Sequence, residues 1–117
     1  MEKTDPINMT VSNVGDKVLQ ILVEKKFFNY NNEAAKFLAL YALEKNLDHS
    51  VDLIEYKIVS PNNKWDSAAF SDVTDMLFLL RGDVDLPYTR IRSLIDLGAR
   101  DVSEKVQRED FRISELL

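Results

Sequence analysis

The 117-residue sequence contains no cysteine, one histidine and only three glycines. The lack of cysteine excludes disulfides, thiol nucleophiles and thiolate zinc sites, and it fits a reducing compartment. The single His49 excludes motifs that bind a metal through two histidines, and the scattered glycines exclude a glycine-rich phosphate loop. Most familiar classes of small enzyme are therefore excluded, and we expect no catalytic residue, no metal site and no cofactor.

Long hydrophobic runs are also missing. The longest apolar stretch, residues 37–43, has seven residues, whereas a membrane-spanning helix needs about 20. Residues 1–6 are polar and lack the basic start and apolar run of a secretory signal. We therefore expect a cytoplasmic protein that does not contact a membrane.

Charge of one sign is in slight excess, because 20 acidic residues outnumber 15 basic ones and give a net charge of −5. Residues 1–60 and 61–117 carry net charges of −2 and −3, so neither half is basic. All arginines follow Lys64, and three of them are candidate anion contacts: Arg90, Arg92 and Arg100. Nucleic-acid binding depends mainly on neutralising phosphates, so we expect it only through such a local patch or through a partner.

The pattern of apolar residues predicts a mainly α fold of about four helices with one or two short strands. We expect one domain over residues 1–117, with 1–6 and 109–117 only partly ordered. Apolar and polar residues alternate over 7–12, which predicts a strand, and 48–60 is expected to be extended. Helical spacing predicts helices over about 13–26, 33–46, 66–80 and 88–106. Asparagines at the starts of the first two are expected to cap them.

Two exposed apolar residues are candidate contacts for a protein partner or for self-association. The second helix is apolar nearly all round, so it is expected at the centre of the fold, with Leu40 inside its narrow polar strip. An ordinary exposed leucine is the favoured interpretation of Leu40, with a partner contact as the alternative. On the third helix Phe78 lies opposite the stripe that we expect to be buried, and an aromatic residue there must meet another element or chain. That stripe consists of Ala69, Val73, Met76, Leu77 and Leu80.

Three further residues have expected structural roles. Gly82 is placed to end the third helix, and Gly98 lies beside the apolar stripe of the fourth, where it allows a neighbour to approach closely. Trp65, the only tryptophan, lies where the third helix is expected to begin. We expect its ring to fasten that helix start to the core rather than to stack on a ligand.

The sequence offers only weak candidates for catalysis. Asp48, His49 and Ser50 contain the residue types of a hydrolase triad, but adjacent residues cannot usually adopt its geometry. Paired carboxylates, which can hold Mg²⁺ in a nuclease, occur at Asp48/Asp52, Asp72/Asp75 and Asp83/Asp85. No supporting ligands accompany them, and acids at a helix start, such as Asp72 and Asp75, complement the helix dipole. A protein without enzymatic activity is therefore the leading hypothesis, with a metal-assisted nuclease as a distant alternative.

Two segments resemble a known family. The pair Phe27-Phe28 followed by the alanine-rich residues 32–43, together with 70–83 and 88–99, is similar to the small DNA phosphorothioation-associated protein 4 family, also called dnd-system-associated protein 4. The similarity covers most of residues 15–107 and consists of apolar spacing and one glycine. It implies a non-enzymatic accessory role in bacterial DNA sulfur modification or defence, with no catalytic residues to transfer.

A second resemblance covers residues 7–47. A short strand, a capped helix, an asparagine turn and a second helix are similar to a ribbon-helix-helix module, in which two chains pair their strands and outward residues read bases. The reading positions here are Asn8, Thr10 and Ser12. The family's strand usually includes a basic residue, and none lies in 7–12. A DNA-binding regulator of this kind is therefore the alternative hypothesis.

Overall fold

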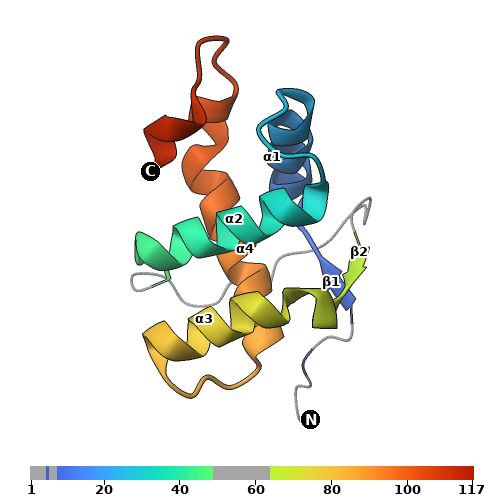
Figure 1. Ribbon diagram of the computed structural model, residues 1–117, viewed down its shortest axis with the longest axis vertical. Helices are drawn as coiled ribbons and strands as arrows, with labels where there is room; N and C mark the ends of the chain where they lie inside the picture. Colours follow the sequence, from blue (N-terminus) through green and yellow to red (C-terminus); the bar gives the residue numbers. More distant parts are fainter. Residues whose placement is uncertain (1–4, 6–7, 49–63) are drawn as a thin grey trace.

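A computed structural model describes residue 5, residues 8–48 and residues 64–117 (Figure 1). These residues form a compact, mainly α structure with a two-stranded sheet, as predicted. The expected extended segment 48–60 lies outside the described residues, except for Asp48. The elements are β1 (Asn8–Thr10), α1 (Asn13–Glu24), α2 (Asn31–Glu44), β2 (Lys64–Asp66), the 3-10 turn η1 (Ser67–Phe70), α3 (Ser71–Arg81), α4 (Pro87–Val106) and the 3-10 turn η2 (Ile113–Leu116).

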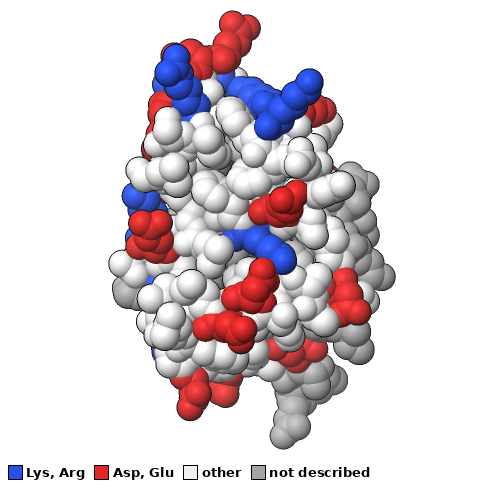
Figure 2. Space-filling model, viewed as in Figure 1, with Lys and Arg blue, Asp and Glu red and all other residues white. Residues whose placement is uncertain are grey.

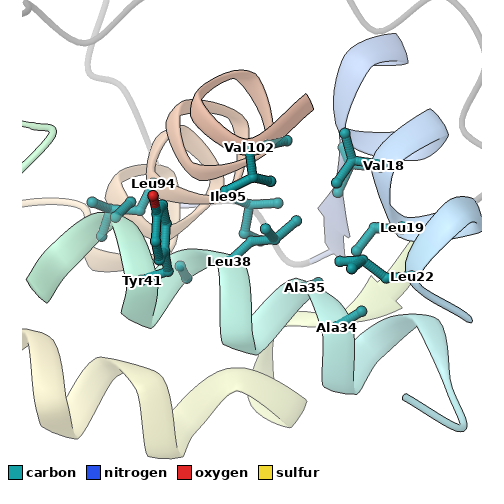
Figure 3. Packing of buried hydrophobic residues seen from close by; sticks show 14 of the residues in the cluster. Val18, Leu19, Leu22, Ala34, Ala35, Leu38, Tyr41, Leu94, Ile95 and Val102 are labelled. Carbon is teal, nitrogen blue, oxygen red and sulfur yellow. The ribbon is translucent and has the colours of Figure 1, made fainter. Parts of the chain in front are cut away.

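Helix α4 is the centre of the packing. It runs along the long direction of the molecule, α2 crosses it, and α1 packs against both (Figure 1). Figure 3 shows Leu38 of α2 directed toward Ile95 and Val102 of α4, while Ala34 and Ala35 lie toward α1. These residues are fully or almost fully buried. The second helix is therefore central to the core, as its all-round apolar sequence predicts.

Gly98 explains how closely α2 and α4 approach. A Cβ atom placed on this residue would lie 2.4 Å from the carbonyl oxygen of Leu38, nearer than non-bonded atoms can come. The expectation that Gly98 admits a close neighbour is confirmed, and the neighbour is the backbone of α2.

The helix caps differ from those predicted. Ser12, rather than Asn13, caps α1, because its Oγ accepts a hydrogen bond of 3.1 Å from the backbone N–H of Gly15. Helix α2 begins after Tyr30, which makes no side-chain cap bond, and so starts earlier than expected. Helices α1 and α2 both end about two residues before their predicted ends. Two residues beyond each end lie Lys26 and Asn46, with φ of 64° and 55°. These left-handed residues turn the chain and stop the helix.

The third helix begins later than predicted, so its predicted start is wrong. Residues 64–66 form β2, which pairs antiparallel with β1 and sets Trp65 opposite Met9. The Asp66 carboxylate then accepts a 2.9 Å hydrogen bond from the N–H of Ala68 and begins η1, so α3 starts only at Ser71. The Trp65 ring packs on Phe70 with centroids 5.6 Å apart, as expected of a residue that fastens this junction to the core.

Residues distant in the sequence cap both ends of α4. The Asp5 carboxylate accepts hydrogen bonds from the N–H groups of Tyr88 and Thr89, at 2.9 and 3.0 Å. At the other end the Lys25 ammonium donates to the carbonyl oxygens of Val106 and Arg108, at 2.6 and 2.7 Å. A carboxylate at the N-terminus and a cation at the C-terminus both complement the helix dipole.

Residues 109–117, expected to be partly ordered, pack against this end of the core. Phe111 is buried and lies edge-on to Phe27, with ring centroids 5.4 Å apart. Leu116 of η2 is also buried. Within the part of the chain that the structure describes, no helix has the length and apolar character to span a membrane.

Candidate interaction surface

Helix α3 exposes most of its large apolar side chains. Its buried residues are Val73, Thr74 and Leu77, whereas four others are exposed to the following fractions: Met76 40%, Phe78 39%, Leu79 77% and Leu80 50%. The prediction that Met76 and Leu80 belong to the buried stripe is wrong, and so is that of Ala69, which is exposed.

A simple feature of the sequence accounts for this exposure. Residues 76–80 are five consecutive apolar residues, and successive residues of a helix point about 100° apart, so the run covers every side of α3. Only one side can face the core, and here it is the side of Phe70, Val73 and Leu77. The unbroken run could have signalled that apolar side chains would be left outside the core.

Interactions at both ends place α3 alongside α2. Near the starts, the Lys36 ammonium lies 3.1 Å from the Asp72 carboxylate. At the ends, the Arg81 guanidinium donates to the carbonyl oxygen of Leu43 at 3.0 Å and to the side-chain oxygen of Asn46 at 2.9 Å. The two helices therefore run in the same direction.

This pairing brings exposed residues of the two helices to one seam. One helical turn beyond the ion pair, α2 carries Leu40, which is 37% exposed, and α3 carries Met76. Leu79 and Leu80 follow Met76 by three and four residues and continue the same face. We call Leu40, Met76, Leu79 and Leu80 the α2–α3 apolar patch.

The two residues expected to contact a partner are both exposed, but the structure does not bring them together. Leu40 belongs to the α2–α3 apolar patch. Phe78 lies two residues from Met76 and from Leu80, so it projects from the opposite flank of α3. Their roles as partner contacts stay predictions.

Acidic residues surround the patch. Asp72 and Asp75 project from α3, Glu44 follows Leu40 by one turn on α2, and Asp83 follows the end of α3; all four are exposed. Figure 2 shows uncharged surface over α2 and α3 with acidic side chains at its edges and also near its middle, where a basic side chain lies between them.

The basic side chains of α2 and α3 form ion pairs within this chain. Lys36 is the only basic residue of α2 and pairs with Asp72, while Arg81 is the only one of α3 and lies 3.0 Å from the buried carboxylate of Asp48. Of the other charges near the patch, Glu44, Asp75 and Asp83 are acidic and Lys45, the exposed residue that follows Glu44, is basic, so the net charge of the border is negative.

The candidate anion-binding arginines do not form one open cluster. On α4, Arg92 and Arg100 lie four residues before and after Asp96, and the Nε of Arg100 is 2.8 Å from that buried carboxylate. Arg90 precedes Arg92 by two residues and so points to another side of the helix, where its Nε is buried without a hydrogen-bond partner. Their contact with an anion stays a prediction.

The strand of the alternative hypothesis is placed differently from a ribbon-helix-helix module. Asn8 is exposed and Thr10 partly exposed, but Ser12 is buried, where it caps α1 and its hydroxyl donates to the Asp96 carboxylate. Strand β1 also pairs with β2 of the same chain. DNA reading by this strand stays a prediction, and the described structure adds no support to it.

The paired carboxylates are dispersed. Asp72 is tied to Lys36, and Asp83 and Asp85 are exposed in the connection from α3 to α4. Across residues 5, 8–48 and 64–117, no three histidine or acidic side chains come together in a way that could hold a metal ion. His49, Ser50 and Asp52 lie outside the described residues.

One shifted pKa belongs to a structural contact between α2 and α4. Burial of Tyr41, together with the hydrogen bond that its hydroxyl donates to Asp101 and the charge of that carboxylate, raises the pKa of Tyr41 to about 12. The phenol is therefore neutral at physiological pH and acts as a hydrogen-bond donor that joins the two helices.

Comparison with protein-family models, with curated proteins and with solved structures gives no match for this chain. The resemblances to the phosphorothioation-associated family and to ribbon-helix-helix modules therefore stay predictions.

Proposed function

We propose that this protein is a non-enzymatic interaction protein that binds a protein partner through the α2–α3 apolar patch. The observation that carries the proposal is the exposure of Leu40, Met76, Leu79 and Leu80 on neighbouring helices. Isolated exposed leucines are ordinary on protein surfaces, but contiguous apolar patches rimmed by polar residues are typical of binding sites.

The resemblance to the phosphorothioation-associated family suggests where such an interaction would operate. We place the protein as an accessory component of a bacterial DNA sulfur-modification or defence system. This setting rests on the resemblance alone, whereas the interaction surface rests on the exposed side chains of α2 and α3.

Site-specific photo-crosslinking in the source organism tests the interaction surface. A photoreactive phenylalanine analogue is placed at Leu79, the most exposed residue of the patch, and in a control protein at Val14 of α1, which is also exposed. We expect one discrete crosslinked product that forms from position 79 and not from position 14. Its identity also tests the setting, because the family resemblance predicts a component of DNA modification machinery.

Binding of the crosslinked protein must then be reproduced with purified components. Leu79→Ser should weaken its binding at least about tenfold, the loss expected when a central apolar contact is removed, and Val14→Ser should leave it unchanged. Products that do not depend on position would contradict the proposal. So would hydrolysis of DNA or nucleotides by the pure protein that disappears with Asp72→Asn or Asp75→Asn.

A further inference from the structure

We infer that the partner segment that binds the α2–α3 apolar patch is a cationic amphipathic helix. The inference rests on the proposed function and adds the chemical class of the partner. It follows from the spacing of the exposed apolar side chains on α3 and from the sign of the charges near them.

The apolar residues of the patch occupy one turn of α3 and one position of the parallel helix α2. Met76, Leu79 and Leu80 repeat at three- and four-residue spacing along α3, and Leu40 lies across the seam on α2. Leu80 follows Met76 by four residues, about 6 Å along the helix axis. An amphipathic helix of a partner can lay an apolar face with the same spacing along this line, which is a common mode of peptide recognition.

The acidic border selects the charge of that helix. Glu44, Asp72, Asp75 and Asp83 lie near the patch. Of the nearby cations, Lys36 and Arg81 are held by acidic groups of this chain and Lys45 is exposed, so the net charge there is negative. A partner helix with lysine or arginine beside its apolar stripe would place opposite charges against this border. Such complementarity speeds association and rejects partners of the wrong sign.

The same charges disfavour a second copy of this chain. In a symmetric dimer the same patch is used by both subunits, so the acidic border of one would meet the acidic border of the other. The chain as a whole also carries a net charge of −5. Phosphate-rich surfaces of nucleic acids and of anionic membranes would be repelled by this face for the same reason.

Three synthetic helical peptides of about 18 residues provide the probes. The first has leucines at three- and four-residue spacing on one face and lysines elsewhere. The second has the same leucines with glutamates in place of lysines, and the third has the composition of the first with the leucines scrambled. Binding is measured by fluorescence anisotropy at about 0.05 M and about 0.5 M salt, since exposed charges are screened at the higher concentration.

Matched variants separate the apolar and the charged parts of the inference. Leu79→Ser removes the most exposed apolar side chain, with Val14→Ser as its control. The pair Asp75→Asn and Glu44→Gln removes two border charges, with Glu104→Gln on the exposed side of α4 as its control. Thermal unfolding verifies that every variant is folded.

We expect the leucine–lysine helix to bind the wild-type protein more tightly than either of the other peptides. Leu79→Ser should weaken that binding at least about tenfold. The two charge substitutions should weaken it about threefold or more at low salt and reduce its salt dependence, whereas both controls should leave binding unchanged.

The remaining outcomes overturn the inference in distinguishable ways. Equal binding of the leucine–glutamate peptide, or no effect of the charge variants, would show that the partner is not cationic and would leave the proposed interaction surface intact. Sedimentation that shows a dimer in the wild type and a monomer in Leu79→Ser would assign the patch to a second copy. If Leu79→Ser binds every peptide as tightly as the wild type does, and the protein does not self-associate, the result would count against both the inference and the proposed function.

Discussion

Helices α3 and α4 both pack beside α2, yet they do so in different ways. Helix α4 buries nine of its 20 residues and brings its backbone against that of α2 at Gly98. Helix α3 buries three of its 11 residues and is held to α2 by charged side chains at its two ends. The contact with α4 makes the core, whereas the contact with α3 leaves apolar surface outside it.

The difference has an energetic meaning. Burying a leucine or methionine side chain stabilises a fold by about 1.5–3 kcal/mol, and α3 gains only part of this from Met76, Leu79 and Leu80. The exposed part of the run therefore adds little to the stability of the isolated chain. A partner that covers the patch would recover part of that free energy on binding.

The largest expected effect tests the closeness of α2 and α4. Replacing glycine by alanine inside an exposed helix normally stabilises it, but Gly98→Ala places a methyl group 2.4 Å from the Leu38 carbonyl oxygen. We expect a loss of at least about 3 kcal/mol in the free energy of unfolding, measured by urea denaturation. Glu104→Ala, on the exposed side of the same helix, should change it by less than about 0.5 kcal/mol. A neutral Gly98→Ala would show that the two backbones are not in contact.

The next effect compares two leucines of α3 that are two residues apart. Leu77 is fully buried and Leu79 is 77% exposed. Leu77→Ala should lower the free energy of unfolding by about 2–4 kcal/mol because it leaves a cavity, whereas Leu79→Ala should change it by less than about 0.5 kcal/mol. The same denaturation experiment measures both. Similar losses for the two variants would mean that the outer face of α3 is covered.

A third prediction concerns how the ends of the two helices are closed. The end of α3 is closed locally at Gly82, with φ of 75°, whereas the end of α4 depends on Lys25 from α1's C-terminal turn. Lys25→Met keeps the apolar stem but removes two charged hydrogen bonds, so we expect a loss of about 2 kcal/mol in thermal or urea unfolding. Lys26→Met, at the neighbouring exposed position, is the control and should be nearly neutral. If both variants lost the same free energy of unfolding, the loss would come from the change in net charge.

The smallest effect depends on pH and tests the link between α2 and α4. Because the pKa of Tyr41 is raised to about 12 from its ordinary value near 10, its protonated form stabilises the folded state. This contribution is fully present below about pH 10 and is lost as the pH rises through about 12. Wild type should therefore lose more stability than Tyr41→Phe over this range, by urea denaturation at successive pH values. Parallel curves would show that Tyr41 ionises equally in the folded and unfolded chain.

The fold class and the central position of α2 follow from the sequence because they depend on the period and breadth of apolar stripes. The same reasoning failed for α3, where five consecutive apolar residues define no stripe. The direction of the core was then decided by Phe70 and Leu77, which a periodicity argument cannot rank above Met76 and Leu80. The candidate patch was therefore only partly foreseen, through Leu40.

The remaining errors share a physical cause. The third helix is predicted from about residue 66, but residues 64–66 pair with β1, and this pairing satisfies their backbone as a strand. Asp5 and Lys25 close the two ends of α4 from more than 80 residues away in the sequence. Contacts of this kind depend on which elements become neighbours, which local patterns do not contain.

The sequence by itself determined the mainly helical class, the lack of a cysteine site and the approximate positions of four helices. These depend on composition and on periods of a few residues. Only the tertiary structure decided which side of α3 faces outward, which backbone approaches Gly98 and which acidic residues surround the α2–α3 apolar patch. These depend on the relative placement of whole helices, which is set by the sum of their packing and not by any one segment.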